Sequence, residues 1–186
     1  GRLWNLSSTL PSVSANDMSS ASSSDGTYQL LSVSGDRVYI SSNYGVSWTV
    51  GITAGSTWKS VAVSSDGSYQ TAINTSVIYC SSSYGSTFSG ITGSLITSDP
   101  STVLLSNCTT ALGNIQYVSG TNYTTNYFLY TSNYGSTWSY RTPSYYGTRM
   151  ACSASGQYVT FVNSSTNQIV VSSDYGLTWA IALTLT

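Results

Sequence analysis

The sequence has no histidine and no glutamate, and only 6% of its 186 residues carry a charge. An average soluble protein has about 25% charged residues, so hydroxyl and amide groups must solvate most of this surface. General acid–base catalysis uses mainly His, Glu, Asp and Lys, and this chain offers only aspartates and one lysine. The composition therefore disfavours an enzyme that works by acid–base chemistry.

The formal net charge is −1, which leaves no basic footprint for nucleic acid and no attraction to an anionic membrane. No apolar run reaches the roughly 18 residues that a membrane-spanning helix needs, so we expect no membrane insertion. Copies that repel each other so weakly can pack closely, as in coats, filaments and virions. We expect an extracellular, cell-surface or virion-surface location, although a secreted protein without such packing fits the same composition.

The three cysteines match neither a disulfide framework nor a metal site, because the chain has no His and no Cys-x-x-Cys pair. We expect Cys80, Cys108 and Cys152 to be free thiols that behave as small hydrophobic residues. No cofactor and no metal are expected.

Four segments repeat one pattern: a hydroxyl residue, a short polar residue, Tyr-Gly, and then Trp or Phe. They span 41–48, 81–88, 131–138 and 172–179, and their glycines lie 40, 50 and 41 residues apart. We call these segments the box turns. Such a period is typical of repeat architectures whose units stack on one another.

A second repeated feature, a short polar residue followed by glycine, precedes three of the four box turns: Asp25-Gly26, Asp66-Gly67 and Ser155-Gly156. An Asp-Gly pair favours a tight hairpin turn. In the third unit we align Tyr117 with Tyr158, because Tyr117 lies 16 residues before Asn133 as Tyr158 lies 16 before Asp174.

Short β-branched or aromatic segments, 38–40, 77–80, 128–130 and 169–171, stand just before the box turns, and no segment has a helical period. Each unit then carries four strands, and stacked sheets cover each other radially. The chain is predicted to be a single all-β domain, 1–186, a β-propeller of about four four-stranded blades. The blades are placed at 18–51, 59–92, 102–141 and 149–186.

The segment 172–179 resembles the Asp-box, or BNR, repeat of sialidases, sortilin-type receptors, xyloglucan-degrading hydrolases and photosystem-assembly propellers. The resemblance implies a propeller in which the box is structural and lies away from the ligand face. The glycine should adopt a positive φ, the short polar residue should accept turn hydrogen bonds, and the aromatic ring should be buried between sheets. The structural box residues are then Asn43, Gly45, Trp48, Ser83, Gly85, Phe88, Asn133, Gly135, Trp138, Asp174, Gly176 and Trp179.

The start of the chain, Gly1-Arg2-Leu3-Trp4, matches the tail of a box turn. Residues 1–10 are therefore expected to be a strand of a preceding blade. Such a strand is surplus in a simple four-bladed ring, so we expect an arc of a larger propeller or an arc that partner chains complete.

Catalysis of the sialidase kind needs a glutamate and a set of spaced arginines, which this sequence lacks. Four of the six aspartates fall in expected turns, which leaves Asp17 and Asp99 as a carboxylate pair for a glycosidase. A partial or inactive glycosidase-type propeller is therefore one alternative.

A lectin-like glycan-binding propeller is another alternative, because Arg141, Tyr145, Tyr146 and Arg149 stand together in a long connection where a sugar ring or a peptide can bind. These tyrosines could equally cover the rim of the core. The box tyrosines Tyr44, Tyr84, Tyr134 and Tyr175 recur once per blade, either as a contact surface or as packing over their own turns. The leading hypothesis is a non-catalytic structural or adhesive module with protein or self partners.

Overall fold

The structure is a computed structural model, and it describes residues 18–53, 57–92, 97–122, 124–145, 147–163 and 165–185. The strand expected in residues 1–10 lies outside these ranges, as do Asp17 and Tyr146. The described strands form four antiparallel sheets, each with four strands that pair in chain order. This arrangement confirms the predicted all-β fold.

The strands alternate with short turns, and we number the sheets in chain order. The first sheet holds β1 (Met18–Ser22), β2 (Gln29–Val33), β3 (Val38–Ser41) and β4 (Thr49–Ile52). The second holds β5 (Trp58–Val63), β6 (Gln70–Asn74), β7 (Val77–Ser81) and β8 (Ser89–Thr92). The third holds β9 (Val103–Thr109), β10 (Gln116–Thr121), β11 (Asn126–Thr131) and β12 (Ser139–Arg141). The fourth holds β13 (Arg149–Cys152), β14 (Val159–Asn163), β15 (Gln168–Ser172) and β16 (Ala180–Thr184).

The apolar segments predicted before the box turns are strands in the structure, which confirms that part of the sequence interpretation. They lie within β3, β7, β11 and β15, the third strand of each sheet. Each box turn then connects the third strand to the fourth, as the repeat predicts.

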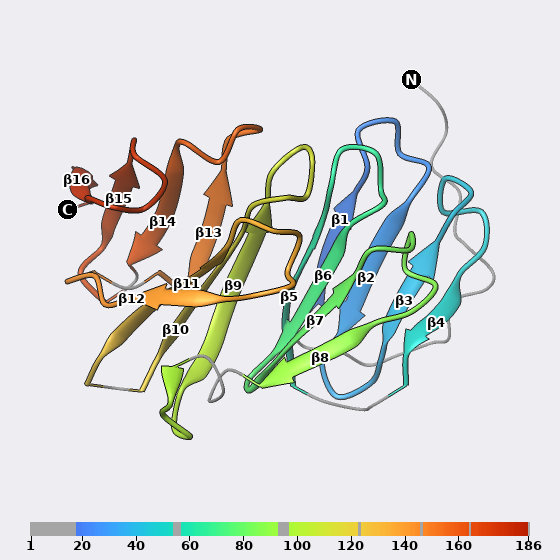
Figure 1. The fold of residues 1–186 in the computed structure, drawn as a ribbon, viewed down its shortest axis with the longest axis horizontal. Helices are drawn as coiled ribbons and strands as arrows, with labels where there is room; N and C mark the ends of the chain where they lie inside the picture. Colours follow the sequence, from blue (N-terminus) through green and yellow to red (C-terminus); the bar gives the residue numbers. More distant parts are fainter. Residues whose placement is uncertain are drawn as a thin grey trace.

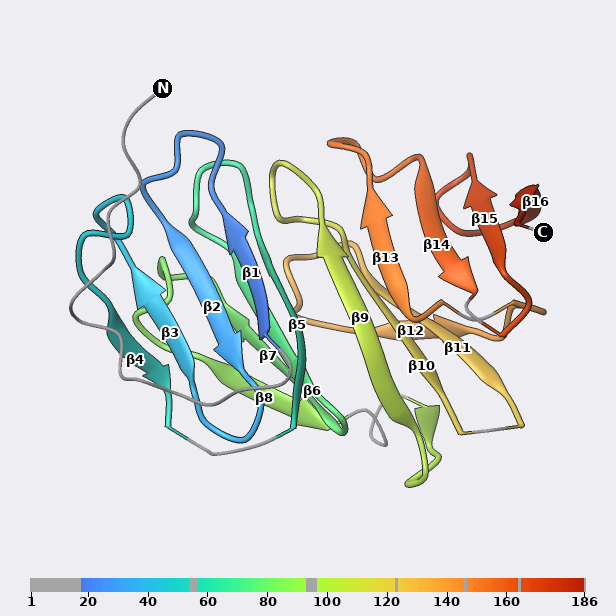
Figure 2. The same cartoon turned by 180° about the vertical axis from the view of Figure 1, so that it is seen from behind.

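The four sheets stand side by side in chain order, with the first and fourth at opposite ends of the molecule (Figure 1). Their first strands, β1, β5, β9 and β13, run next to one another (Figure 2), and each contacts the next. A closed four-bladed ring would instead pack the fourth sheet on the first. The described residues therefore form an open arc, with a sheet face left at each end.

The hydrophobic core is divided into three clusters, and each cluster fills the space between two consecutive sheets. Leu30 and Ile40 of the first sheet pack with Trp58 and Ala72 of the second. Ile73 and Ile78 of the second sheet pack with residues of the third, and Tyr117 and Phe128 of the third pack with Val159 of the fourth. Each sheet is therefore stabilised by its neighbour rather than by a core of its own.

The box aromatics are less buried than the sequence predicts, because all four side chains are only partly buried. Phe88, Trp138 and Trp179 pack against the three intersheet clusters in turn. Each aromatic residue lies in the turn directly before the outer strand of its sheet. Trp48 belongs to the first sheet and joins none of these clusters.

The alignment of Tyr117 with Tyr158 is wrong by two residues. Gln116 pairs with Thr131, the first residue of its box turn, and Val159 pairs with the equivalent Ser172. The residue that matches Tyr158 is therefore Ile115. The spacing misled because β10 and β11 have six residues each, one more than β14 and β15.

Substitutions at two glycines allow the free-energy cost of a positive φ to be compared with the cost of crowding between sheets. Gly35 and Gly176 have φ values of 81° and 77°. A Cβ at Gly35 would meet nothing within 4 Å, whereas at Gly176 it would lie 2.2 Å from the Phe128 ring.

Gly35→Ala should therefore lower the free energy of unfolding by about 1–2 kcal/mol, the cost of a left-handed alanine. Gly176→Ala should cost a further 1–3 kcal/mol or so, because the two sheets must move apart. Equal losses in urea unfolding would contradict this account of intersheet packing.

Candidate functional site

Each box turn is held by its short polar residue, as the sequence predicts. The Ser47, Thr137 and Thr178 N–H groups donate to Asn43, Asn133 and Asp174 over 2.8 to 2.9 Å. In the second sheet the Thr87 N–H donates to Ser83 Oγ over 3.1 Å. Aspartate, asparagine and serine therefore hold the same turn, because each places an acceptor oxygen at the same point.

The first residue of each box turn makes a second hydrogen bond that the sequence interpretation missed. The glycine N–H donates to the hydroxyl of Ser41, Ser81, Thr131 or Ser172 over 2.8 to 3.1 Å. The available signal was the hydroxyl residue that stands at this position in all four segments.

The tyrosine before each box glycine adopts a left-handed backbone conformation. Tyr44, Tyr84, Tyr134 and Tyr175 have φ values of 55° to 62°, and the glycines that follow have values of 77° to 82°. Two consecutive residues with positive φ form the centre of each box turn. A bulky side chain rarely adopts this conformation, so its recurrence in every sheet needs a compensating contact.

Ring packing across the sheet boundary supplies that contact for two of the four tyrosines. Tyr84 packs on Tyr28 of the first sheet with the rings tilted by 34° and their centroids 4.8 Å apart, and Tyr134 stacks on Tyr69 of the second at 4.4 Å. The box turn of one sheet is therefore joined to the hairpin turn of the preceding sheet. In the fourth sheet Tyr175 faces a pocket that Ile115 also lines.

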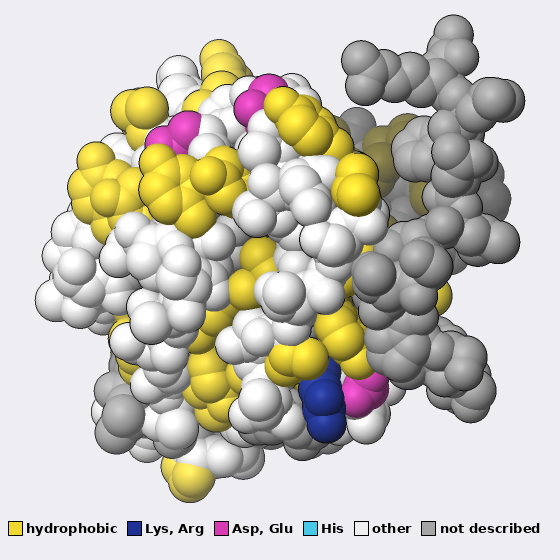
Figure 3. Space-filling model, turned by 90° about the vertical axis from the view of Figure 1, so that its right-hand side faces the viewer, with side chains coloured by type: hydrophobic (Ala, Val, Ile, Leu, Met, Phe, Trp, Pro, Cys, Tyr) yellow, Lys and Arg dark blue, Asp and Glu magenta, His cyan; other side chains and the backbone are white. Residues whose placement is uncertain are grey.

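These tyrosines remain between 44% and 64% exposed, so they form a surface as well as a contact. We call this surface the tyrosine row, made of Tyr28, Tyr44, Tyr69, Tyr84, Tyr134, Tyr158 and Tyr175. Figure 3 shows hydrophobic side chains grouped near one edge of the molecule, with acidic side chains among them.

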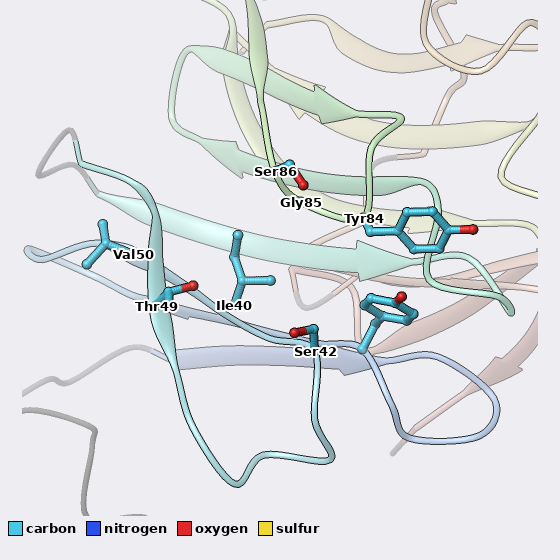
Figure 4. A pocket seen from close by; sticks show the side chains of 8 residues that line it. Ile40, Ser42, Thr49, Val50, Tyr84, Gly85 and Ser86 are labelled. Atoms are coloured by element: carbon cyan, nitrogen blue, oxygen red, sulfur yellow. The ribbon is translucent and has the colours of Figure 1, made fainter.

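A pocket of about 360 Å³ lies beside the row, between the first two sheets. Figure 4 shows Tyr84 and Gly85 on one side of this pocket, and Ile40, Ser42 and Thr49 on the other.

Replacing a box tyrosine by asparagine should relieve backbone strain, because asparagine tolerates the left-handed region. Tyr134→Asn also removes a stacked ring worth about 0.5–1.5 kcal/mol, whereas Tyr44 has no ring partner within the described residues. We expect Tyr44→Asn to be neutral or stabilising, and Tyr134→Asn to be less stable than it by about 1 kcal/mol. Thermal unfolding of both variants tests this, and the opposite order would contradict the stacking account.

The box turns also allow a matched test of charge at one position. Hydrogen bonds, first that from the Thr178 hydroxyl, lower the pKa of Asp174 to about 2. Asn133→Asp should acquire a similarly low pKa, so its added stability is present above about pH 4 and is lost as the pH falls towards 2. Asn133→Ala should lose about 1 kcal/mol at every pH. An Asp variant with no acid sensitivity between pH 4 and 2 would contradict this assignment.

The structure does not bring Arg141 and Arg149 together. Arg141 ends the outer strand β12, where its guanidinium carbon lies 4.0 Å from the centroid of the Tyr130 ring and Nη1 donates to the Tyr175 carbonyl over 3.3 Å. Arg149 begins the inner strand β13. Tyr145 is partly buried in the connection between these strands, and Tyr146 lies outside the described residues.

Arg149 instead shares a small cavity with Lys59, on the inner strands of the arc. This cavity has a volume of about 100 Å³, and Met18, Ser19, Trp58 and Ser60 also line it. It gathers two of the four cations among the described residues, and no acidic side chain lines it. The single lysine of the sequence was the available signal, but only the fold places it near an arginine.

The described aspartates mostly serve turns. Ser23 and Thr27 donate to Asp25, so its pKa falls to about 2. Asp99 accepts hydrogen bonds from Ser101 and from Asn122, so its pKa is also about 2. A general acid needs a pKa near the working pH, so hydrogen-bonded carboxylates of this kind do not suit that role. Asp99 remains an acceptor that orders its own loop.

The three cysteines are free thiols packed at sheet boundaries, as the sequence predicts. Burial raises the pKa of Cys80 to about 12, and Cys80 packs against the cluster between the second and third sheets. Cys108 and Cys152 lie in β9 and β13 and pack in the next cluster, where burial raises the pKa of Cys108 well above its usual value. Thiolates are disfavoured at Cys80 and Cys108, so these two thiols have little nucleophilic character.

The described ranges contain no cluster of three or more His, Cys, Asp or Glu side chains placed to hold a metal ion. Among the same residues, no helix is long and apolar enough to cross a membrane.

No protein-family model matches the sequence, and no curated protein matches it. The structure is similar to the glycoside hydrolase family 74 enzyme of Niastella koreensis, with 16% identity, a TM-score of 0.65, and coverage of 92% of this chain and 25% of that one. It is also similar to a chain of a nidogen/laminin complex, with 10% identity, a TM-score of 0.68, and coverage of 88% and 63%. YCF48 bound to a D1 peptide matches with 14% identity, a TM-score of 0.58, and coverage of 85% and 51%.

These similarities and the four stacked sheets define the chain as a protein with a β-propeller fold. The chain spans about a quarter to two thirds of the length of these three structures. At such low identity the comparisons show the fold alone, and they include both an enzyme and protein complexes.

Proposed function

We propose that this chain is a non-catalytic β-propeller of the Asp-box type, with a structural or adhesive role in an extracellular, cell-surface or virion-surface assembly. The tyrosine row is the observation that carries the proposal. Tyrosine is enriched at protein interfaces because its ring is apolar and its hydroxyl can hydrogen-bond at a wet rim. Seven tyrosines in the turns of all four sheets, on a chain with 6% charged residues, favour contact with protein.

The Asp-box assignment is supported by the hydrogen bonds of the box turns. The acceptor oxygen, the positive-φ glycine and the aromatic residue recur in all four units, although only Asp174 keeps the acid. The non-catalytic assignment is supported by the carboxylates, since Asp25, Asp99 and Asp174 accept hydrogen bonds from their own turns.

A second candidate function is binding of an anionic group in the cavity that Lys59 and Arg149 share. Among the described residues no acidic side chain lines this cavity, and its two cations favour a carboxylate or a sulfated sugar over a neutral glycan. This candidate replaces the lectin-like hypothesis at residues 141–149, because the fold separates Arg141 from Arg149. A Lys59→Ala variant that binds heparin as well as the parent does would exclude it.

Xyloglucan is the appropriate substrate for the catalytic test, because the similar structures include a xyloglucanase. The parent protein should release no reducing sugar from xyloglucan, and the double variant Asp17→Asn with Asp99→Asn should behave in the same way. Turnover by the parent that the double variant loses would contradict the non-catalytic assignment.

The proposed role in protein contact has a separate test, because it depends on the tyrosine row and not on the aspartates. A variant with Tyr44, Tyr84, Tyr134 and Tyr175 all changed to asparagine keeps the left-handed turns and removes the rings. It should show weaker self-association than the parent in sedimentation velocity. Unchanged sedimentation would remove the row as a contact surface.

A further inference from the structure

Three kinds of contact recur between consecutive sheets, the first at all three boundaries and the other two at the first two boundaries. Each has one half left over at either end of the arc. The first is a ladder of backbone hydrogen bonds between hairpin turns. The Ser24 N–H donates to the Ser65 carbonyl over 2.8 Å, Ser65 to Ala111 over 2.8 Å, and Ala111 to Ala154 over 3.0 Å. Within the described residues the ladder ends at the Ser24 carbonyl on the first sheet and at the Ala154 N–H on the fourth.

The second recurring contact is the stacked tyrosine pair. Tyr158 occupies the position in the fourth sheet that Tyr28 and Tyr69 occupy in the first and second, just before the second strand. Its ring is 53% exposed, and the box tyrosine of the first sheet, Tyr44, is 64% exposed. The two ends of the arc therefore carry the two members of one stacked pair.

The third contact is between a hairpin glycine and the tyrosine of the preceding sheet. A Cβ at Gly67 would lie 2.3 Å from Tyr28, and a Cβ at Gly113 would lie 2.5 Å from Tyr69. At the equivalent Gly26 the nearest described side chain is Tyr44 of the same sheet, 4.0 Å away. The first sheet thus has room for one more ring at this position.

Both end sheets also carry apolar side chains. The outward face of the fourth sheet carries Val162 and Leu183, which are 38% and 48% exposed. Ile73 of the second sheet, the equivalent of Val162, is fully buried against the third. The first sheet bears a pocket of about 430 Å³, lined by Ala21, Leu30 and Trp48 together with Ser20, Ser22 and Gln29.

We propose that the fourth sheet of one copy docks on the first sheet of a second copy of this chain, head to tail. Tyr158 then lies on Gly26 and stacks on Tyr44 of the second copy, and the Ala154 N–H donates to its Ser24 carbonyl. The second copy is the occupant that repeats all three internal contacts, and a net charge of −1 gives little repulsion between copies. Such a heterologous interface closes into a ring or extends as a filament. The inference rests on the proposed contact role and names its partner and its residues.

Sedimentation velocity over a concentration series tests the interface, with two variants at the open end and one control. Tyr158→Ala removes the ring, and Val162→Asp places a charge in the docking face. Leu112→Ser is the control, because Leu112 is 70% exposed at the tip of a hairpin turn in the third sheet, away from both ends. The parent and the control should associate, and each end variant should weaken association about tenfold or more. Thermal unfolding checks that all variants remain folded.

Orientation is tested by crosslinking with a short bismaleimide reagent. Ser24→Cys and Ala154→Cys variants keep both rings and the backbone groups of the ladder, so they should crosslink when mixed, and neither should crosslink alone. A parent that stays monomeric at every concentration, or a Ser24→Cys variant that crosslinks to itself, overturns the proposal. If the four-asparagine row variant loses association but Tyr158→Ala and Val162→Asp keep it, the row remains a contact surface and the head-to-tail interface is wrong.

Discussion

The packing of each sheet on the next is the interaction on which the rest of this structure depends. A four-stranded sheet has two faces, and the three apolar clusters of the described residues lie between consecutive sheets. The box glycines and hairpin glycines allow this approach, because a Cβ at Gly85 or Gly135 would lie within about 3 Å of the preceding sheet. The tyrosine before each box glycine adopts a strained backbone conformation, and Tyr84 and Tyr134 gain a ring partner across the same boundary.

The same packing explains why so few charges are needed. Turns that other proteins hold with charged residues are held here by serine, threonine and asparagine, whose short side chains reach the turn amides. Most described aspartates accept hydrogen bonds within turns, and the only ion pair among the described residues joins the adjacent Asp36 and Arg37. Salt should therefore have little effect on the fold, because screening acts on charges that contribute little to it.

Much of the fold could be predicted because the decisive features are local. The eight residues 172–179 are enough to predict a turn between two strands, because they contain Asp174 and Gly176 and follow an apolar strand segment. The register of the third sheet could not be predicted, since two extra residues in its β10–β11 hairpin shift Tyr117 against the box turn. The cavity lined by Lys59 and Arg149 was less predictable, because Lys59 lies in the second sheet and Arg149 in the fourth. Residues close in sequence, such as Arg141 and Arg149, lie at the outer and inner edges of different sheets.

Native-state hydrogen exchange tests most directly whether the sheets depend on one another. The amides of β6, β7, β10 and β11 lie in sheets covered on both faces, whereas every residue of β16 is exposed. If intersheet packing holds the fold, those central strands should exchange through one shared unfolding event with a common free energy, and the fourth sheet should open at lower free energy. Four sheets that exchange independently, each with its own free energy, would contradict it.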